Sequence, residues 1–262
     1  MLQKSSSSDK IAMASPAMSW KRRTVLLIAL LAWVFVSFAM AQVVIVALIW
    51  LLKLIHVPFG AIDPTVLETA IAALIYIVTL GLVIGLPWLL KKRKTTLNDV
   101  GLDRLPTWTD VLMAPAGLVI YFVLSASLTF LATSFLPWFN ASQPQDTGFS
   151  QLNFGYEYFL AFITLVVIAP VAEETIFRGY LLGKLRKFVP VWVAILATSV
   201  LFGAVHGAWN LAIDTFALSV VMSLLRQNTG SLWASILLHM TKNGIAFYIL
   251  FINPTLLHTL GA

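Results

Sequence analysis

The chain has 262 residues, of which 60% are hydrophobic and 11% are charged, and its net charge is +6. Soluble domains carry about 25% charged residues, so this composition indicates a multi-pass membrane protein and leaves no room for a large soluble domain. Cysteine is absent, which excludes disulfides, thiol nucleophiles and cysteine-ligated metal sites and leaves His, Glu, Asp and Ser for chemistry.

The predicted elements are membrane-spanning helices that follow a polar tail. Residues 1–20 are serine-rich and are expected to form a disordered cytoplasmic tail. The first apolar run follows Lys21–Arg23 and is too long for the core of a signal peptide, so it is predicted to be a tilted span that stays in the protein. Six further runs are near or above the ~20 residues that cross a bilayer, at 66–90, 109–136, 156–182, 188–206, 208–225 and 231–252.

The sequence therefore predicts an all-α, polytopic transmembrane helix bundle of about seven spans, within a range of six to eight. Only a tight turn separates 188–206 from 208–225, so one of these two runs could be short or partly re-entrant. The division expected along the chain is the tail, amino-terminal transmembrane helices over 21–150, and a core over 151–262 that carries the motifs described below.

The basic residues indicate how the spans are oriented. Every Lys and Arg except Lys53 and Lys242 falls in the tail or in segments on the tail's side of the membrane. Because cytoplasmic segments carry an excess of Lys and Arg, the amino terminus is expected in the cytoplasm and the carboxyl terminus outside. These residues are not interleaved with aromatic side chains in a patch, so no nucleic-acid partner is expected.

Ionisable groups inside the spans are the most informative residues, because a charge at a helix centre costs roughly 2.5–3.5 kcal/mol on insertion scales. In the stretch EETIFR, Glu174 and Arg178 are four residues apart and favour an ion pair. Glu173 points about 100° away from Glu174 and is free to face a substrate or a water. Pro170 precedes both and could bend or open the helix. The alternative for the pair alone is an interfacial contact that closes the helix at the inner surface.

Two histidines lie on other predicted spans. FGAVH places Phe202 and His206 on one helix face, and HMTKN does the same for His239 and Asn243. Polar or aromatic companions at helical spacing on separate helices favour a functional role for both imidazoles over simple packing. Asp214 has two open interpretations, a buried hydrogen-bond partner or a bystander near the outer surface.

A carboxylate and imidazoles that meet in a dry cavity could activate water against a carbonyl. Glu173 could take the proton of the water while His206 orients it. His239 and Asn243 could donate hydrogen bonds to the oxyanion. Alternatively, Glu173, His206 and His239 could hold a zinc ion whose bound water is the nucleophile. Both versions stay open, whereas acyl-enzyme chemistry is not expected because no GxSxG elbow is present.

EETIFR, FGAVH and HMTKN resemble the EExxxR, FxxxH and HxxxN motifs of the CPBP family, the type II CAAX protease and bacteriocin-processing intramembrane endopeptidases. The motifs stand in the family's order, and Glu173 is as far from His206 as His206 is from His239. The resemblance covers roughly 155–252. It implies hydrolysis of a peptide bond close to the membrane surface, by a metal-dependent or a metal-free glutamate mechanism. The site residues that it implies are Glu173, Glu174, Arg178, His206, His239 and Asn243.

The resemblance also implies a peptide or protein substrate at the lipid bilayer. Prokaryotic members are linked to small-peptide processing or bacteriocin immunity, and a bacterial plasma membrane is the expected location. The sequence leaves open the substrate, the cleavage position, prenylation and the oligomeric state. The alternatives to an endopeptidase are a non-catalytic membrane scaffold or bacteriocin-immunity protein of the same family, and a proton-coupled transporter, since Glu and His also form proton relays in membranes.

Overall fold

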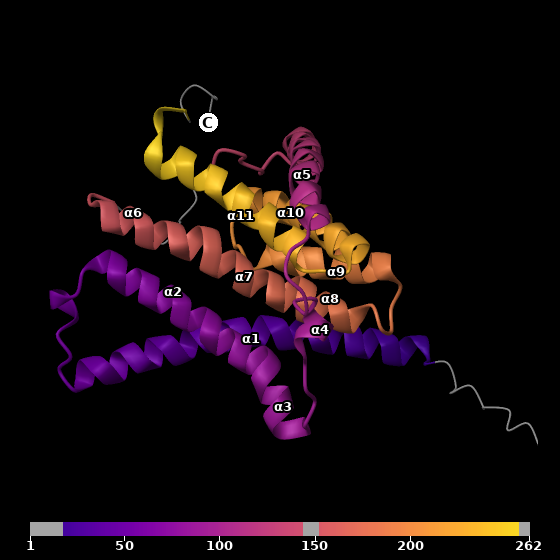
Figure 1. Cartoon of the computed structure of the whole chain (residues 1–262), viewed down its shortest axis with the longest axis horizontal. Helices are drawn as coiled ribbons and strands as arrows, with labels where there is room; N and C mark the ends of the chain where they lie inside the picture. The colour runs from indigo at the N-terminus through magenta and orange to yellow at the C-terminus, as the bar shows by residue number, and fades with distance from the viewer. Residues whose placement is uncertain (1–17, 144–151, 257–262) are drawn as a thin grey trace, which may run out of the picture.

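Figure 1 shows the computed structural model of the chain, which describes residues 18–143 and 152–256. Within these residues the chain is helical, and residues 1–17 of the expected tail lie outside them. The α-helices are α1 (Trp20–Leu54), α2 (Pro64–Leu80), α3 (Leu86–Lys91), α4 (Leu97–Val100), α5 (Trp108–Phe135), α6 (Gly155–Phe162), α7 (Ala169–Glu174), α8 (Leu182–Leu185), α9 (Val191–Ala204), α10 (Trp209–Thr229) and α11 (Trp233–Phe247). A 3₁₀ turn, η1 (Phe59–Ala61), and four π-helical segments, η2 (Gly81–Gly85), η3 (Ile163–Ile168), η4 (Thr175–Leu181) and η5 (Tyr248–Ile252), connect or extend them.

Six helical stretches of the described residues are long and apolar enough to cross a membrane. They are Trp20–Leu54, Pro64–Lys91, Trp108–Phe135, Gly155–Leu185, Trp209–Thr229 and Trp233–Ile252. The remaining apolar helix, α9, has 14 residues, so it is the short member of the two runs joined by a tight turn. At 1.5 Å per residue it is about 21 Å long, less than the ~30 Å hydrocarbon core of a bilayer. The structure confirms a polytopic all-α membrane protein.

The helix ends lie where side chains cap free backbone groups or where a glycine adopts the left-handed conformation. Asp63 accepts hydrogen bonds from the first amides of α2, and Pro64 follows it at a position where no amide donor is needed. Thr96 and Asp99 form a reciprocal capping box at the start of α4. Gly230 ends α10 in the left-handed conformation, at φ +68°. These short-range signals set the boundaries between the spans.

The segment Gly155–Leu185 is one helix that changes its hydrogen-bonding pattern along its length. It runs through α6, η3, α7, η4 and α8, and Pro170 lies in the first turn of α7. Proline has no amide to donate, and the π-helical η3 directly precedes this point. A second π-helical segment, η4, begins directly after Glu174. The expected irregularity at the proline is therefore a change of helix type on both sides of the glutamates.

The core of the bundle lies where α10 packs against α9, α5 and α11. α9 and α10 approach closely at Gly203, where an added Cβ would lie 2.6 Å from the carbonyl oxygen of Ala212. The helices α1 and α2 form a hairpin that contacts the long helix 155–185 from the other side (Figure 1). The face of the bundle between this hairpin and α9 is where the motifs meet.

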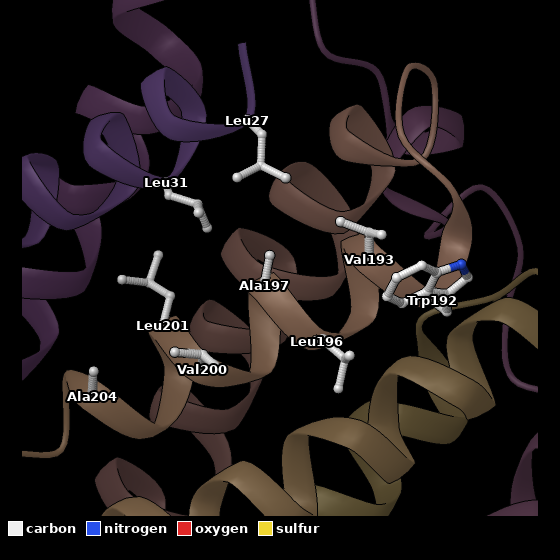
Figure 2. A pocket seen from close by; sticks show the side chains of 9 residues that line it. All are labelled: Leu27, Leu31, Trp192, Val193, Leu196, Ala197, Val200, Leu201 and Ala204. Atoms are coloured by element: carbon white, nitrogen blue, oxygen red, sulfur yellow. The ribbon is translucent and has the colours of Figure 1, made fainter. Parts of the chain in front are cut away.

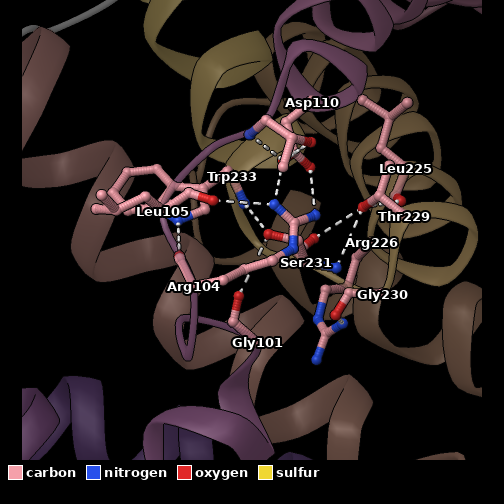
Figure 3. A network of polar contacts seen from close by, with 11 residues as sticks. Gly101, Arg104, Leu105, Asp110, Leu225, Arg226, Thr229, Gly230, Ser231 and Trp233 are labelled. Carbon is pink, nitrogen blue, oxygen red and sulfur yellow. Dashed lines mark hydrogen bonds and ion pairs between the residues drawn. The ribbon is translucent and has the colours of Figure 1, made fainter.

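The connection between α4 and α5 is fixed to the turn between α10 and α11 (Figure 3). Arg104 forms an ion pair with Asp110 at 2.5 Å, and its carbonyl accepts a hydrogen bond from Trp233 Nε1 at 2.6 Å. The Leu232 amide donates to the Gly101 carbonyl at 2.8 Å. These bonds hold the start of α5 against the start of α11, the helix that carries the third motif.

Candidate functional site

The three motif segments meet around the ring of Phe202. This ring lies 4.9 Å from the His206 ring and 6.0 Å from the His239 ring, centroid to centroid. The Arg178 guanidinium carbon lies 4.2 Å above the same ring, a cation–π contact. Side chains of η4, α9 and α11 are thereby brought together inside the bundle. The sequence had identified Phe202 only as a companion of His206, whereas the structure makes it the common packing surface.

Glu174 and Arg178 form the expected ion pair, with Glu174 Oε1 at 2.8 Å from Arg178 Nη1. Both side chains have an exposed fraction of 0%, so the pair lies in the interior of the helix bundle. The same carboxylate oxygen is 2.9 Å from Nδ1 of His239. Removing one partner of such a buried pair leaves an uncompensated charge, and the bond from His239 to Glu174 joins α11 to α7.

The hydrogen bonds of the two histidines determine which ring nitrogens are free. A carbonyl only accepts, so Nδ1 of His206, at 2.6 Å from the Phe202 carbonyl, carries a proton. The ionised Glu174 carboxylate likewise only accepts, which places a proton on Nδ1 of His239. In the neutral form of each imidazole, Nε2 is then the unprotonated nitrogen. Nε2 of His239 lies 3.9 Å from Glu173 Oε2.

Glu173 and Glu174 face different partners, as their position around the helix predicts. Glu173 Oε1 accepts a hydrogen bond of 2.5 Å from the hydroxyl of Tyr76 on α2, and 13% of its side chain is exposed. It lines a cavity of about 550 Å³ together with His206 and with residues of α1 and α2, among them Gln42. Glu173 is therefore the acidic group of the site that a substrate or a water can reach.

Asn243, on the same helix as His239, is engaged in helix packing. Its Nδ2 donates a hydrogen bond of 2.9 Å to the carbonyl of Leu165 in η3. Of the six expected site residues, Glu173 and His206 line the cavity. Glu174, Arg178 and His239 lie behind them, each nearly or fully buried.

Tyr76 and Gln42 were missed by the sequence analysis. Both lie outside the segment that carries the motifs, on α2 and α1, and reach the site only through tertiary packing. The signal that could have found them is a polar side chain within an otherwise apolar span.

Among the described residues, no three His, Asp or Glu side chains form a cluster that could hold a metal ion. Zinc bonds to nitrogen and oxygen are about 2.0–2.2 Å long. Nδ1 of His206 and Nδ1 of His239 donate to the Phe202 carbonyl and to Glu174, which leaves Nε2 of each ring free, and His239 Nε2 lies 3.9 Å from Glu173 Oε2. As placed, no three of the described side chains form a zinc site, so no step of the proposed reaction is assigned to a metal ion.

A second, apolar groove of about 440 Å³ runs between α1 and α9. Figure 2 shows Leu27 and Leu31 on the α1 side and Val193 and Ala197 on the α9 side. Ala204, at the end of α9, lines both this groove and the cavity of Glu173. The catalytic candidates are thus next to a surface that lipid-soluble groups can occupy.

The fold and the site define a multi-pass membrane protein with a carboxylate and imidazoles enclosed by its helices. Residues 155–245 match the family model described as "Type II CAAX prenyl endopeptidase Rce1-like". The matched segment holds the three motifs, which confirms the resemblance seen in the sequence.

One relative with a related sequence comes from Escherichia coli. The chain is 34% identical over 95 residues to an uncharacterized 24.3 kDa protein of that organism. The match covers 34% of this chain and 44% of the E. coli protein, so the chain spans less than half the length of this relative. No solved structure matches the chain.

Proposed function

We propose that the protein is an intramembrane endopeptidase that hydrolyses a peptide bond close to the membrane surface, with Glu173 as the general base. The observation that carries the proposal is the carboxylate of Glu173 in the wall of a cavity that also contains His206, within an apolar helix bundle. The family match supports the protease class, since its description names an endopeptidase.

The reaction begins with a water held between Glu173 and the free nitrogens of the imidazoles. The 3.9 Å between Glu173 Oε2 and His239 Nε2 is too long for a direct hydrogen bond and suits a bridging water. Because Tyr76 occupies Oε1, Oε2 is the oxygen that takes the proton. The hydroxide oxygen then bonds to the scissile carbonyl carbon, whose π electrons move to the oxygen.

The resulting oxyanion needs hydrogen-bond donors in a site without bulk water. In this proposal the oxyanion accepts a hydrogen bond from the second amide N–H of Asn243, and Nε2 of His239 accepts one from the O–H that the attacking water keeps. Glu174 at Nδ1 orients the His239 ring, as a carboxylate does in a catalytic triad. Collapse of the intermediate breaks the C–N bond, and Glu173 returns its proton to the leaving amine.

The substrate class proposed is a peptide or protein segment that enters from the bilayer. Support comes from the position of the cavity, whose wall is formed partly by α1 and α2, and from the apolar groove that meets it at Ala204. CAAX-type carboxyl-terminal segments and small membrane-active peptides are the two classes to assay.

The test is cleavage by the purified protein in proteoliposomes, with both peptide classes supplied and new termini identified by mass spectrometry. Glu173→Gln and His206→Ala are expected to abolish cleavage while the protein still accumulates with an unchanged unfolding temperature. Asp103→Asn, exposed in the connection between α4 and α5 and outside the cavity lining, is the matched control and should cleave normally. Undiminished cleavage in both site variants would refute the proposal.

A further inference from the structure

A second charge cluster, partly buried, joins α5, α10 and α11. Asp214 of α10 accepts hydrogen bonds at Oδ1 from the Tyr121 hydroxyl at 2.6 Å and the Ser125 hydroxyl at 2.7 Å, both on α5. Its Oδ2 lies 3.3 Å from Nζ of Lys242 on α11. Of the two interpretations that the sequence left open for Asp214, the structure shows the hydrogen-bond partner.

Both charged side chains of the cluster are only partly exposed, and placing them within membrane spans costs free energy. The side chains of Lys242 and Asp214 are 16% and 23% exposed, and a groove of about 540 Å³ lined by hydroxyls of α5 reaches Asp214. Ion pairs within spans are rare because desolvation opposes the attraction between the charges, and apolar replacements of both partners are often neutral or stabilising. A contribution to stability alone therefore does not account for this pair.

The position of Lys242 along α11 suggests what the pair does. Lys242 lies between His239 and Asn243, whose bonds to Glu174 and to the Leu165 carbonyl fix α11 against the long helix 155–185. Lys242 fixes the same helix against α10 and, through Asp214, against α5. The helix that carries two motif residues is thus held by polar contacts on neighbouring faces, to the long helix 155–185 and to α10, at almost one level.

Small rotations of α11 would displace the site. With side chains, a helix has a radius of about 5–6 Å, so a rotation of about 20° moves its surface atoms by about 2 Å. A displacement of about 1 Å at a catalytic group can reduce the rate roughly 10²-fold. The 3.9 Å spacing between His239 Nε2 and Glu173 Oε2 therefore depends on a fixed rotation of α11.

We propose that Asp214 and Lys242 are positioning residues, whose ion pair sets the rotation of α11 and holds His239 facing Glu173. The catalytic consequence rests on the proposed function, whereas the rotation of α11 can be measured without it. The chain contains no cysteine, so a pair of introduced cysteines can report this rotation without interference from native thiols.

A cross-link between η3 and α11 reports this rotation. A Cβ at position 244 would lie 3.8 Å from Cγ1 of Val166, so Val166→Cys with Gly244→Cys places two thiols within disulfide reach. The rate of copper-phenanthroline oxidation is measured in proteoliposomes. The backgrounds are the otherwise unchanged chain, Asp214→Asn, Lys242→Met, the double variant of these two, and Lys242→Arg.

The two single variants and the double variant are expected to lose most of the rapid cross-linking, and Lys242→Arg to retain it because the charge is kept. In the same backgrounds without the cysteines, kcat is expected to fall roughly 10- to 100-fold with little change in KM. The double variant leaves no charge unpaired, so it separates rotation from folding if a single variant unfolds. Thr129→Val, in the same groove but not bonded to Asp214 among the described residues, is the matched control.

Cross-linking that is equally fast in the folded double variant would overturn the positioning role, whatever happens to cleavage. Loss of rapid cross-linking in the Asp214→Asn and Lys242→Met variants, together with rapid cross-linking in Lys242→Arg, supports the role. This holds even if the unchanged chain cleaves no peptide. In that second case the proposed endopeptidase function fails and the assignment of the ion pair stands.

Discussion

Nδ1 of His239 donates a hydrogen bond of 2.9 Å to Oε1 of Glu174, although the two residues are 65 positions apart in the chain. The contact joins the first motif to the third, in the interior of the bundle. It also separates the roles of the adjacent glutamates. Glu174 is enclosed by Arg178 and His239, whereas Glu173 faces the cavity and Tyr76.

The first prediction concerns the buried pair of Glu174 and Arg178. Arg178→Met leaves a fully buried carboxylate without its cation and is expected to lower the free energy of unfolding by roughly 3–5 kcal/mol. The double variant Glu174→Gln, Arg178→Met removes both charges and should recover a large part of this loss. Unfolding in detergent, followed by circular dichroism, measures both values. Losses that simply add in the double variant would show that the two charges are not coupled.

The second prediction concerns Tyr76, which donates to Glu173 across the interface of α2 and α7. Tyr76→Phe keeps the ring and removes the hydroxyl. A hydrogen bond to a charged group contributes about 1.5–3 kcal/mol, so kcat should fall roughly 10- to 100-fold while KM changes little. Tyr248→Phe, half exposed on η5, is the control and should match the unchanged protein. Equal kcat in all three proteins would remove Tyr76 from the site.

Much of the fold could be predicted from the sequence, because apolar runs and charge placement are local signals. The run 188–206 was expected to be one of two candidates for a short helix, and α9 has 14 residues. The pairing of Glu174 with Arg178 and the contact of Phe202 with His206 also follow from helical spacing. These relationships lie within one helix, where periodicity alone fixes which side chains meet.

The contacts between helices could not be predicted in this way. Periodicity does not determine which face of α2 turns towards α7, so Tyr76 as the partner of Glu173 required the packed structure. The same holds for Lys242, which the sequence placed only within a span and which pairs with Asp214 of another helix. The π-helical segments on both sides of α7 add to the difficulty, because they change the residue spacing on which face assignments depend.

The third prediction concerns Gln42 on α1. Its carboxamide is exposed and lines the cavity that contains Glu173, on a helix that is otherwise apolar at this level. A polar group there can hydrogen-bond the backbone of a bound peptide without reaching the reacting atoms. Gln42→Leu is therefore expected to raise KM several-fold, about 1 kcal/mol of binding, with kcat nearly unchanged. Steady-state kinetics with the cleaved peptide gives both constants, and a fall in kcat at constant KM would contradict a binding role.

The last prediction concerns the contact of α9 with α10, which supports His206. A Cβ at Gly203 would lie 2.6 Å from the Ala212 carbonyl oxygen, which belongs to the backbone and has no rotamer to change. Gly203→Ala must therefore move the two helices apart, and overpacking of this kind costs roughly 1–3 kcal/mol. Since His206 follows three residues later, cleavage should fall together with stability.

The matched substitution for this test is Gly81→Ala, in η2. A Cβ at position 81 would meet no atom within 4 Å, so alanine there should be neutral or stabilise the helix by up to about 1 kcal/mol. The unfolding temperatures of both variants are measured in the same detergent. Gly203→Ala should unfold at a lower temperature than the parent, and Gly81→Ala at the same or a higher temperature. If Gly203→Ala were as stable and as active as the parent, the close approach of α9 to α10 would not be needed to hold His206 in the cavity wall.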